Sequence, residues 1–148
     1  MKAIDALYRS GVAIEPHRTV GEAAQVMETA GVGSLAVIDG DVLVGIVTDR
    51  DLVRRGLAKG VPSDARIDAL MSTPVVTIDA EADLETAFAT FRDHGLRRIP
   101  VMRSGRFVGM LVLDDLLLVV SNHLDSLVKP IIAEAMFAHR DVSVPAQV

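Results

Sequence analysis

The 148-residue sequence contains no cysteine, which excludes a disulfide framework, thiolate chemistry and Cys-ligated zinc or iron–sulfur sites. Aromatic residues make up only 3% of the chain, and 15 basic residues are outnumbered by 20 acidic ones, for a net charge of −5. An acidic chain with few aromatics is a poor match to a general nucleic-acid binder. We therefore expect no nucleic-acid partner, although a small basic cluster can still hold one anionic ligand.

Targeting and membrane signals are also missing from the sequence. The first residues, Met1 to Asp5, contain no uninterrupted apolar run of the kind that a signal peptide needs. The most apolar stretch, residues 107–120, is interrupted by Asp114 and Asp115 and is too short to span a bilayer. The expectation is a soluble, cytoplasmic protein without a membrane partner.

The strongest pattern that is present is an internal repeat. A shift of the chain by 64 positions places residues 12–14 on residues 76–78, and Gly31, Gly45 and Asp51 on Gly95, Gly109 and Asp115. Upstream, Ile4–Leu7 recurs as Ile67–Leu70 with a shift of 63, which predicts that one residue was gained or lost in between. Residues 58–64, which include Gly60 and Pro62, have the composition of a linker.

Each repeat predicts the same order of elements, β-α-β-β-α. A capping box of Thr19 and Glu22 begins the first helix, and Gly31 and Gly95 stand where left-handed C-caps are needed. Tight turns are expected at Asp39-Gly40 and Ser104-Gly105. The remaining predicted elements are strands at 12–14, 34–38 and 42–47, with a helix at 49–57, and strands at 75–78, 99–102 and 106–111, with a helix at 114–124.

The fold class that follows is α/β (α+β), with two repeats packed around a pseudo-twofold axis and paired clefts between the sheets. The predicted boundaries are repeat one at 1–57, a linker at 58–65, repeat two at 66–124, and a C-terminal helical extension and tail at 125–148. Within the extension, Pro130 is expected to interrupt the helix, residues 131–139 to form a further short helix, and residues 141–148 to fray.

Two short motifs resemble those of a known family. Residues 45–52, GIVTDRDL, match the pattern G-h-h-T-x-x-D, and residues 95–101, GLRRIPV, match G-h-x-x-h-P. Together with the duplication, over about residues 1–122, they resemble a tandem pair of cystathionine-β-synthase (CBS) domains, or Bateman module. The resemblance implies a regulatory, non-catalytic module that binds an adenosyl ligand (AMP, ADP, ATP, NAD or S-adenosylmethionine). It also implies a homodimer.

The first motif has a chemical interpretation at a nucleotide site. A carboxylate such as Asp51 accepts hydrogen bonds from both ribose hydroxyls, while Thr48, Arg50 and a helix N-terminus favour phosphate. Adenine is expected between the aliphatic residues Ala13, Ile14 and the strand 34–36, with Ser34 and Leu35. The alternative is that Thr48 and Asp51 form a capping box. Repeat two favours the ribose-binding interpretation, because it keeps Asp115 although Val112 replaces the threonine that a capping box needs.

The second motif contributes two adjacent cations, Arg97 and Arg98. Strand alternation sends them to opposite sides, so one is expected in the central cleft, where it can bind phosphate, and the other on the surface. We therefore expect one competent site, with adenosine on repeat one and phosphates reaching Arg97 or Arg98. The second site is expected to be weaker, with these residues: Val76, Thr77, Pro100 and Asp115.

No catalytic or metal motif appears in the sequence. The four histidines, His17, His94, His123 and His139, do not have metal-ligand spacing, and no P-loop, G-x-S-x-G or complete G-x-G-x-x-G is present. The expectation is therefore no enzyme, no metal and no catalytic cofactor, with the signal passed to an unidentified effector protein. The alternative function is a ligand-free dimerisation or scaffold protein of the same fold.

Overall fold

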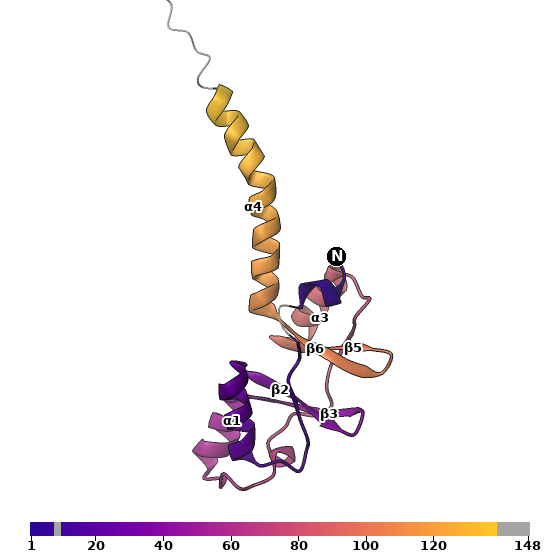
Figure 1. Ribbon diagram of the computed structural model, residues 1–148, viewed down its shortest axis with the longest axis vertical. Helices are drawn as coiled ribbons and strands as arrows, with labels where there is room; N and C mark the ends of the chain where they lie inside the picture. The colour runs from indigo at the N-terminus through magenta and orange to yellow at the C-terminus, as the bar shows by residue number, and fades with distance from the viewer. Residues whose placement is uncertain (8–9, 139–148) are drawn as a thin grey trace, which may run out of the picture.

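Each half of the chain forms a three-stranded sheet with the same pairing (Figure 1). The computed structural model describes residues 1–7 and 10–138. In the first half, β1 (Ala13–Ile14) pairs parallel to β2 (Ser34–Asp39), which pairs antiparallel to β3 (Val42–Thr48). In the second half, β4 (Ile78–Asp79), β5 (Arg98–Arg103) and β6 (Arg106–Val112) repeat this order. The predicted mixed α/β class with two repeats is confirmed.

The start of the first helix in repeat one and the ends of the first helices in both repeats are as the sequence predicts. α1 (Val20–Ala30) begins with the capping box, in which Thr19 Oγ1 accepts the Glu22 N–H at 3.1 Å and Glu22 Oε2 accepts the Thr19 N–H at 2.8 Å. The latter bond holds the pKa of Glu22 below its usual value. α3 (Leu84–His94) begins with Asp83 instead. Both helices end at left-handed glycines, Gly31 at φ 63° and Gly95 at φ 60°.

Two local predictions need correction. The strand expected at 75–78 is almost entirely absent, because only Ile78 and Asp79 pair with β5. The first hairpin turns one residue later than predicted: Asp39 still pairs with Val42, so the loop is Gly40-Asp41, with Gly40 at φ 61°. The second hairpin turns at Ser104-Gly105 as predicted, and both residues have positive φ.

The repeat keeps the same shift of 64 in its upstream segments, so the predicted shift of 63 is wrong. The 3-10 turns η1 (Ala3–Ala6) and η4 (Ile67–Ala69) begin at positions related by this shift. Ala3 N–H donates to Ala82 O at 2.7 Å, and Ile67 N–H donates to Arg18 O at 2.7 Å. Both donors and acceptors are related by 64, so no residue was gained or lost.

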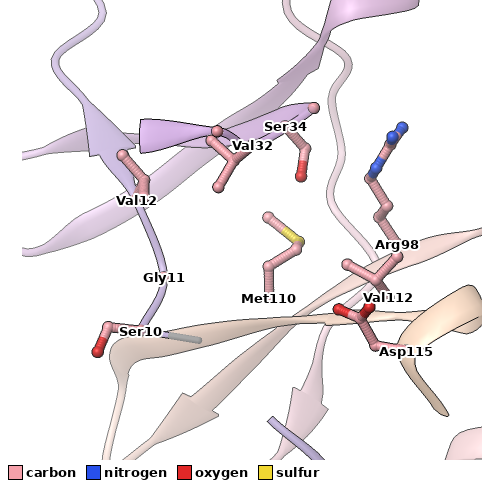
Figure 2. Close-up of a pocket in the computed structure, with 11 residues that line it drawn as sticks. Ser10, Gly11, Val12, Val32, Ser34, Arg98, Met110, Val112 and Asp115 are labelled. Carbon is pink, nitrogen blue, oxygen red and sulfur yellow. The ribbon is translucent and has the colours of Figure 1, made fainter. Parts of the chain in front are cut away.

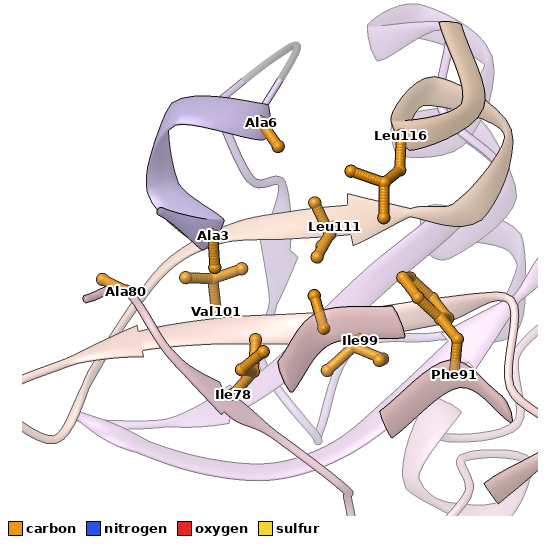
Figure 3. Close-up of a cluster of buried hydrophobic side chains, with 10 residues drawn as sticks. Ala3, Ala6, Ile78, Ala80, Phe91, Ile99, Val101, Leu111 and Leu116 are labelled. Atoms are coloured by element: carbon orange, nitrogen blue, oxygen red, sulfur yellow. The ribbon is translucent and has the colours of Figure 1, made fainter. Parts of the chain in front are cut away.

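These two turns are exchanged between the halves. Ala3 and Ala6 of η1 are buried in the core of the second half, with Ile78, Phe91, Ile99 and Leu111 (Figure 3). Ile67 of η4 and the following Leu70 are buried in the core of the first half, with Met27, Leu35 and Val47. Each core is therefore completed by a segment that the sequence assigns to the other repeat, and this ties the halves together.

The second helices of the two repeats differ strongly. In repeat one, α2 (Asp49–Asp51) continues as a π turn, η2 (Leu52–Gly56), and a 3-10 turn, η3 (Leu57–Lys59). In repeat two, α4 (Leu113–Ala138) is one helix that runs through Pro130, so the predicted interruption and separate short helix are wrong. Proline removes one N–H from the helix and its ring crowds the carbonyl four residues earlier, but the residues after it can continue the hydrogen-bond ladder. Residues 139–148 lie outside the described part of the chain.

The length of α4 also corrects the expectation that the most apolar stretch is too short to span a bilayer. Leu113–Met136 covers 24 residues, has a mean hydropathy of 1.4 and is 6% buried. By length and composition alone, this segment is long and apolar enough to cross a membrane. Asp125 and Lys129, near its middle, would each cost about 2.5–3.5 kcal/mol at a bilayer centre, whereas each Leu, Ile or Val contributes only about 0.3–0.6 kcal/mol. The pair alone would offset about ten such residues.

The exchanged turns predict a coupling between residues 102 positions apart in the sequence. A Cβ at Gly109 would lie 2.6 Å from Leu7 Cδ1, so Gly109→Ala should destabilise the fold, and less so in a Leu7→Ala background. We expect a coupling energy of about 0.5–3 kcal/mol from urea unfolding of the four proteins. The matched control is Gly45→Ala, which would meet Met71 instead. The effects of Gly45→Ala and Leu7→Ala on the free energy of unfolding should simply add. Coupling between Gly45→Ala and Leu7→Ala, or simple addition of the effects of Gly109→Ala and Leu7→Ala, would contradict the exchange.

Candidate functional site

A cleft of about 210 Å³ lies where the N-terminal ends of β1 and β2 meet β6 and the start of α4 (Figure 2). It combines both repeats. Repeat one supplies the approach to β1 and the α1–β2 connection, and repeat two supplies the beginning of β5, the end of β6 and the first turn of α4. The lining residues are Ser10, Gly11, Val12, Gly31, Val32, Gly33, Ser34, Arg98, Met110, Val112 and Asp115.

Asp115 is the carboxylate of this cleft. It is on the first turn of α4, and Figure 2 shows its side chain turned toward the space between the strands. Val112 takes the position that Thr48 has in repeat one and has no hydroxyl to form a capping box. The Asp115 carboxylate has no hydrogen bond or ion pair with a side chain or backbone group of the described ranges 1–7 and 10–138. Within this part of the chain, no group competes with a ligand for its acceptor oxygens.

Arg98 is the cation of the cleft and reaches across to the other repeat. Its Nη2 lies 4.0 Å from Asp49 Oδ1, at the start of α2, and its side chain is 29% exposed. A Cβ at Gly33 would lie only 2.8 Å from this Nη2 atom. Glycine at position 33 therefore gives the guanidinium room to lie beside the repeat-one backbone.

The walls between these two charged groups are mainly apolar. Val32 and Met110 point into the space from opposite sides, and Val12 lies beside them (Figure 2). Ser34 is 6% exposed and directs its hydroxyl toward the same space. Aliphatic walls, one carboxylate and one guanidinium suit a ligand with a flat apolar part, a polyhydroxyl part and an anionic part.

Thr48 and Asp51 form a capping box, which was the alternative to a ribose-binding role. Thr48 N–H donates to Asp51 Oδ2 at 2.9 Å, and Asp51 N–H donates to Thr48 Oγ1 at 3.1 Å. The other carboxylate oxygen of Asp51 lies 3.8 Å from Arg55 Nε. Asp51 lines an open depression with Arg50 and Arg54, away from Ser34 and Arg98. Asp51 and Arg50 were expected to share the first site with Ser34 and Arg98, and they do not line the same cleft.

Several other predicted contact residues are placed elsewhere. Ile14 and Leu35 belong to the core of the first half, and Pro100 is fully buried, so their side chains do not line the cleft. Ala13 lines a separate depression with Glu15 and Arg18, and Thr77 lines another with the first hairpin. Val76 is half-buried outside the cleft. The prediction combined the strands of each repeat with the acid of the same repeat. In the structure, the cleft combines strand ends of repeat one with the acid of repeat two.

The expected division of the arginine pair agrees with the structure. Arg98 lines the cleft, and Arg97 is exposed, with its Nη2 2.9 Å from Asp114 Oδ1. Sequence reasoning missed these lining residues: Ser10, Gly11, Val12, Gly31, Val32, Gly33 and Met110. The signal for Gly11 was its glycine identity: a Cβ there would lie 2.8 Å from the Gly109 backbone, so only glycine lets the segment before β1 cross β6.

Among the described residues, no group of three or more His, Cys, Asp or Glu side chains is arranged to hold a metal ion. His94 and His123 each bond a carbonyl of their own helix, and His17 lies 3.0 Å from Glu15 Oε2. His139 is outside the described part of the chain.

Comparison with known proteins identifies the class to which this arrangement belongs. A model of the CBS domain matches residues 5–58 and 67–122. YlbB of Bacillus subtilis is 42% identical over 99 residues, which cover 66% of this chain and 67% of YlbB. Hypoxic response protein 1 of Mycobacterium tuberculosis is 35% identical over 102 residues, covering 68% of this chain and 71% of that protein.

Solved structures have the same fold. A crystal structure of Hypoxic Response Protein I, with two coordinated zinc ions, has a TM-score of 0.70 at 32% identity and covers 79% of this chain and 97% of that one. PAE2072 of Pyrobaculum aerophilum, complexed with AMP, has a TM-score of 0.72 at 22% identity, covering 82% and 99%. The fold and the inter-repeat cleft define a paired-repeat module. The chain belongs to the CBS-domain family and carries two CBS domains in tandem.

The capping box predicts a structural role for Thr48. Thr48→Val, which copies the residue of repeat two, removes the acceptor of the Asp51 N–H and should lower the free energy of unfolding by about 1 kcal/mol. The matched control is Thr77→Val, at an exposed threonine, which should stay within about 0.5 kcal/mol. Urea unfolding measures both. Equal effects of the two substitutions would show that the cap contributes nothing.

Proposed function

We propose that the protein is a regulatory module that binds an adenine nucleotide in the cleft between its repeats. The single observation that carries the proposal is Asp115, a carboxylate that has no partner among the described residues and is turned into an apolar cleft that also holds Arg98. A carboxylate can accept a hydrogen bond from each of two vicinal ribose hydroxyls. The proposal moves the ribose-binding role from Asp51 to its repeat-two counterpart.

The parts of the ligand follow the chemistry of the lining. Adenine lies between Val12, Val32 and Met110, the ribose faces Asp115, and the phosphate faces Arg98, which can bind it through two N–H groups. The first turn of α4 adds the partial positive charge of a helix N-terminus. Arg97, held by Asp114 on the surface, takes no part.

Size and charge favour a nucleoside monophosphate among the adenosyl ligands. A cleft of about 210 Å³ lies at the small end of ligand sites, and one nucleotide fits it better than the two nucleotides of NAD. One guanidinium, already near Asp49, balances one phosphate better than three. AMP is therefore the proposed ligand, and its binding would pass a signal to a separate effector protein rather than start a reaction.

Binding of AMP to Asp115 is tested by isothermal titration calorimetry. Wild-type protein should bind AMP, and Asp115→Ala should weaken binding about 10- to 150-fold, the equivalent of a hydrogen bond to a charged group. The matched control is Asp114→Ala, which removes the adjacent acid that faces Arg97 and should leave the affinity for AMP unchanged. Absence of heat at millimolar AMP, or loss of binding in Asp51→Ala but not in Asp115→Ala, would overturn the proposed site.

A second function is a ligand-free dimerisation or scaffold protein, and the exposed apolar residues of α4 favour it. Ligand linkage separates the two functions. Under the proposed function, AMP at a hundredfold excess over its dissociation constant stabilises the fold by about 2.7 kcal/mol, and Asp115→Ala abolishes the effect. A scaffold protein would show no stabilisation in either protein.

A further inference from the structure

Asp49 lies at the rim of the cleft, beside the guanidinium that the proposed phosphate would meet. Its Oδ1 atom is 4.0 Å from Arg98 Nη2, and its side chain is 64% exposed. Asp49 does not belong to the residues that line the cleft, so its carboxylate lies just beyond the cationic end of that space. A negative group in this place affects how much negative charge a ligand can bring there.

Local contacts define the position of the Asp49 carboxylate. The backbone N–H of Asp49 donates to Gly33 O at 3.0 Å, and Asp49 Oδ1 accepts the Arg50 N–H at 2.8 Å. A Cβ at Gly33 would lie 2.8 Å from Arg98 Nη2 and 3.1 Å from Asp49 Oδ2. The acid and the guanidinium therefore lie against the same point of the repeat-one backbone.

The fold by itself does not require an acid at position 49. The equivalent position of repeat two, 64 residues later, is Leu113, the first residue of α4. The start of α2 is already capped by Thr48 and Asp51, and Asp51 also supplies the negative charge that a helix N-terminus favours. Local folding therefore leaves the charge of Asp49 unexplained.

We propose that Asp49 is a specificity-determining residue that limits the ligand to one phosphate. The inference rests on the proposed function, with the ribose at Asp115 and the first phosphate at Arg98. The Arg98 guanidinium makes no hydrogen bond within residues 1–7 and 10–138, so its N–H groups can bind that phosphate. Asp49 competes with this phosphate only weakly, because an exposed ion pair contributes little.

A second or third phosphate would extend past Arg98 toward Asp49. The repulsion between like charges grows with the charge of the phosphate chain. Arg98 is the only cation among the described residues that line the cleft, and Arg50 lines the separate depression of Asp51. The added phosphates therefore meet a carboxylate and no further cation, so ADP and ATP should bind more weakly than AMP.

Isothermal titration calorimetry with adenosine, AMP, ADP and ATP tests the role of Asp49. EDTA is present in every titration, so that no divalent ion can bridge the carboxylate and the phosphates. Asp49→Asn removes the charge and keeps an oxygen that can accept the Arg50 N–H, so the variant should fold. Its affinity for adenosine should be unchanged, and its affinity for AMP should rise about 2- to 5-fold, the contribution of an exposed ion pair. The gain should be larger for ADP and largest for ATP.

The matched control is Asp114→Asn, which removes the same charge from an acid that faces Arg97 at 2.9 Å. This variant should leave all four affinities unchanged. Wild-type protein that binds neither adenosine nor AMP would refute the proposed function, and the role of Asp49 with it. Three results would overturn the role of Asp49 alone: wild-type protein that binds ATP as tightly as AMP, equal gains for AMP and ATP in Asp49→Asn, or the same gains in Asp114→Asn.

Discussion

The exchange of two short turns between the repeats is the constraint on which the rest of this structure depends. η1 completes the core of the second half, and η4 completes the core of the first, through backbone hydrogen bonds that occupy equivalent places in the two repeats. Close packing makes each core intolerant of losing its borrowed segment. The two halves therefore cannot separate without opening both cores, and the cleft between them has fixed walls.

Within this frame, one substitution between the repeats makes them chemically unequal. Thr48 and Asp51 satisfy each other at the start of α2, while Val112 leaves Asp115 without that partner. A cap contributes about 1 kcal/mol to stability, so repeat two gives up a small stabilisation and has a carboxylate that no capping box occupies. Gly33 adds to the asymmetry, because it admits Arg98 from the other repeat. The acid and the cation of the cleft thus come from repeat two, and the backbone room comes from repeat one.

The cleft and the projecting helix share a starting point. Asp115 precedes Leu117 by two positions, and Leu116 between them anchors α4 in the core. A ligand held by Asp115 would touch the first turn of the helix whose exposed side begins one residue after this anchor.

The sequence by itself determined the duplication, the order of elements, the capping box of α1, the C-cap glycines of α1 and α3, and that one arginine of the pair Arg97 and Arg98 enters the cleft while the other stays on the surface. These features depend on local periodicity, on side chains a few residues apart and on alternation along a strand. Only the tertiary structure decided that Ser34 faces Asp115 rather than Asp51, that η1 and η4 change places, and that α4 continues past Pro130. The physical reason is that these outcomes depend on which surfaces meet across the two halves, and a one-dimensional pattern does not record contacts between segments that are far apart in the chain.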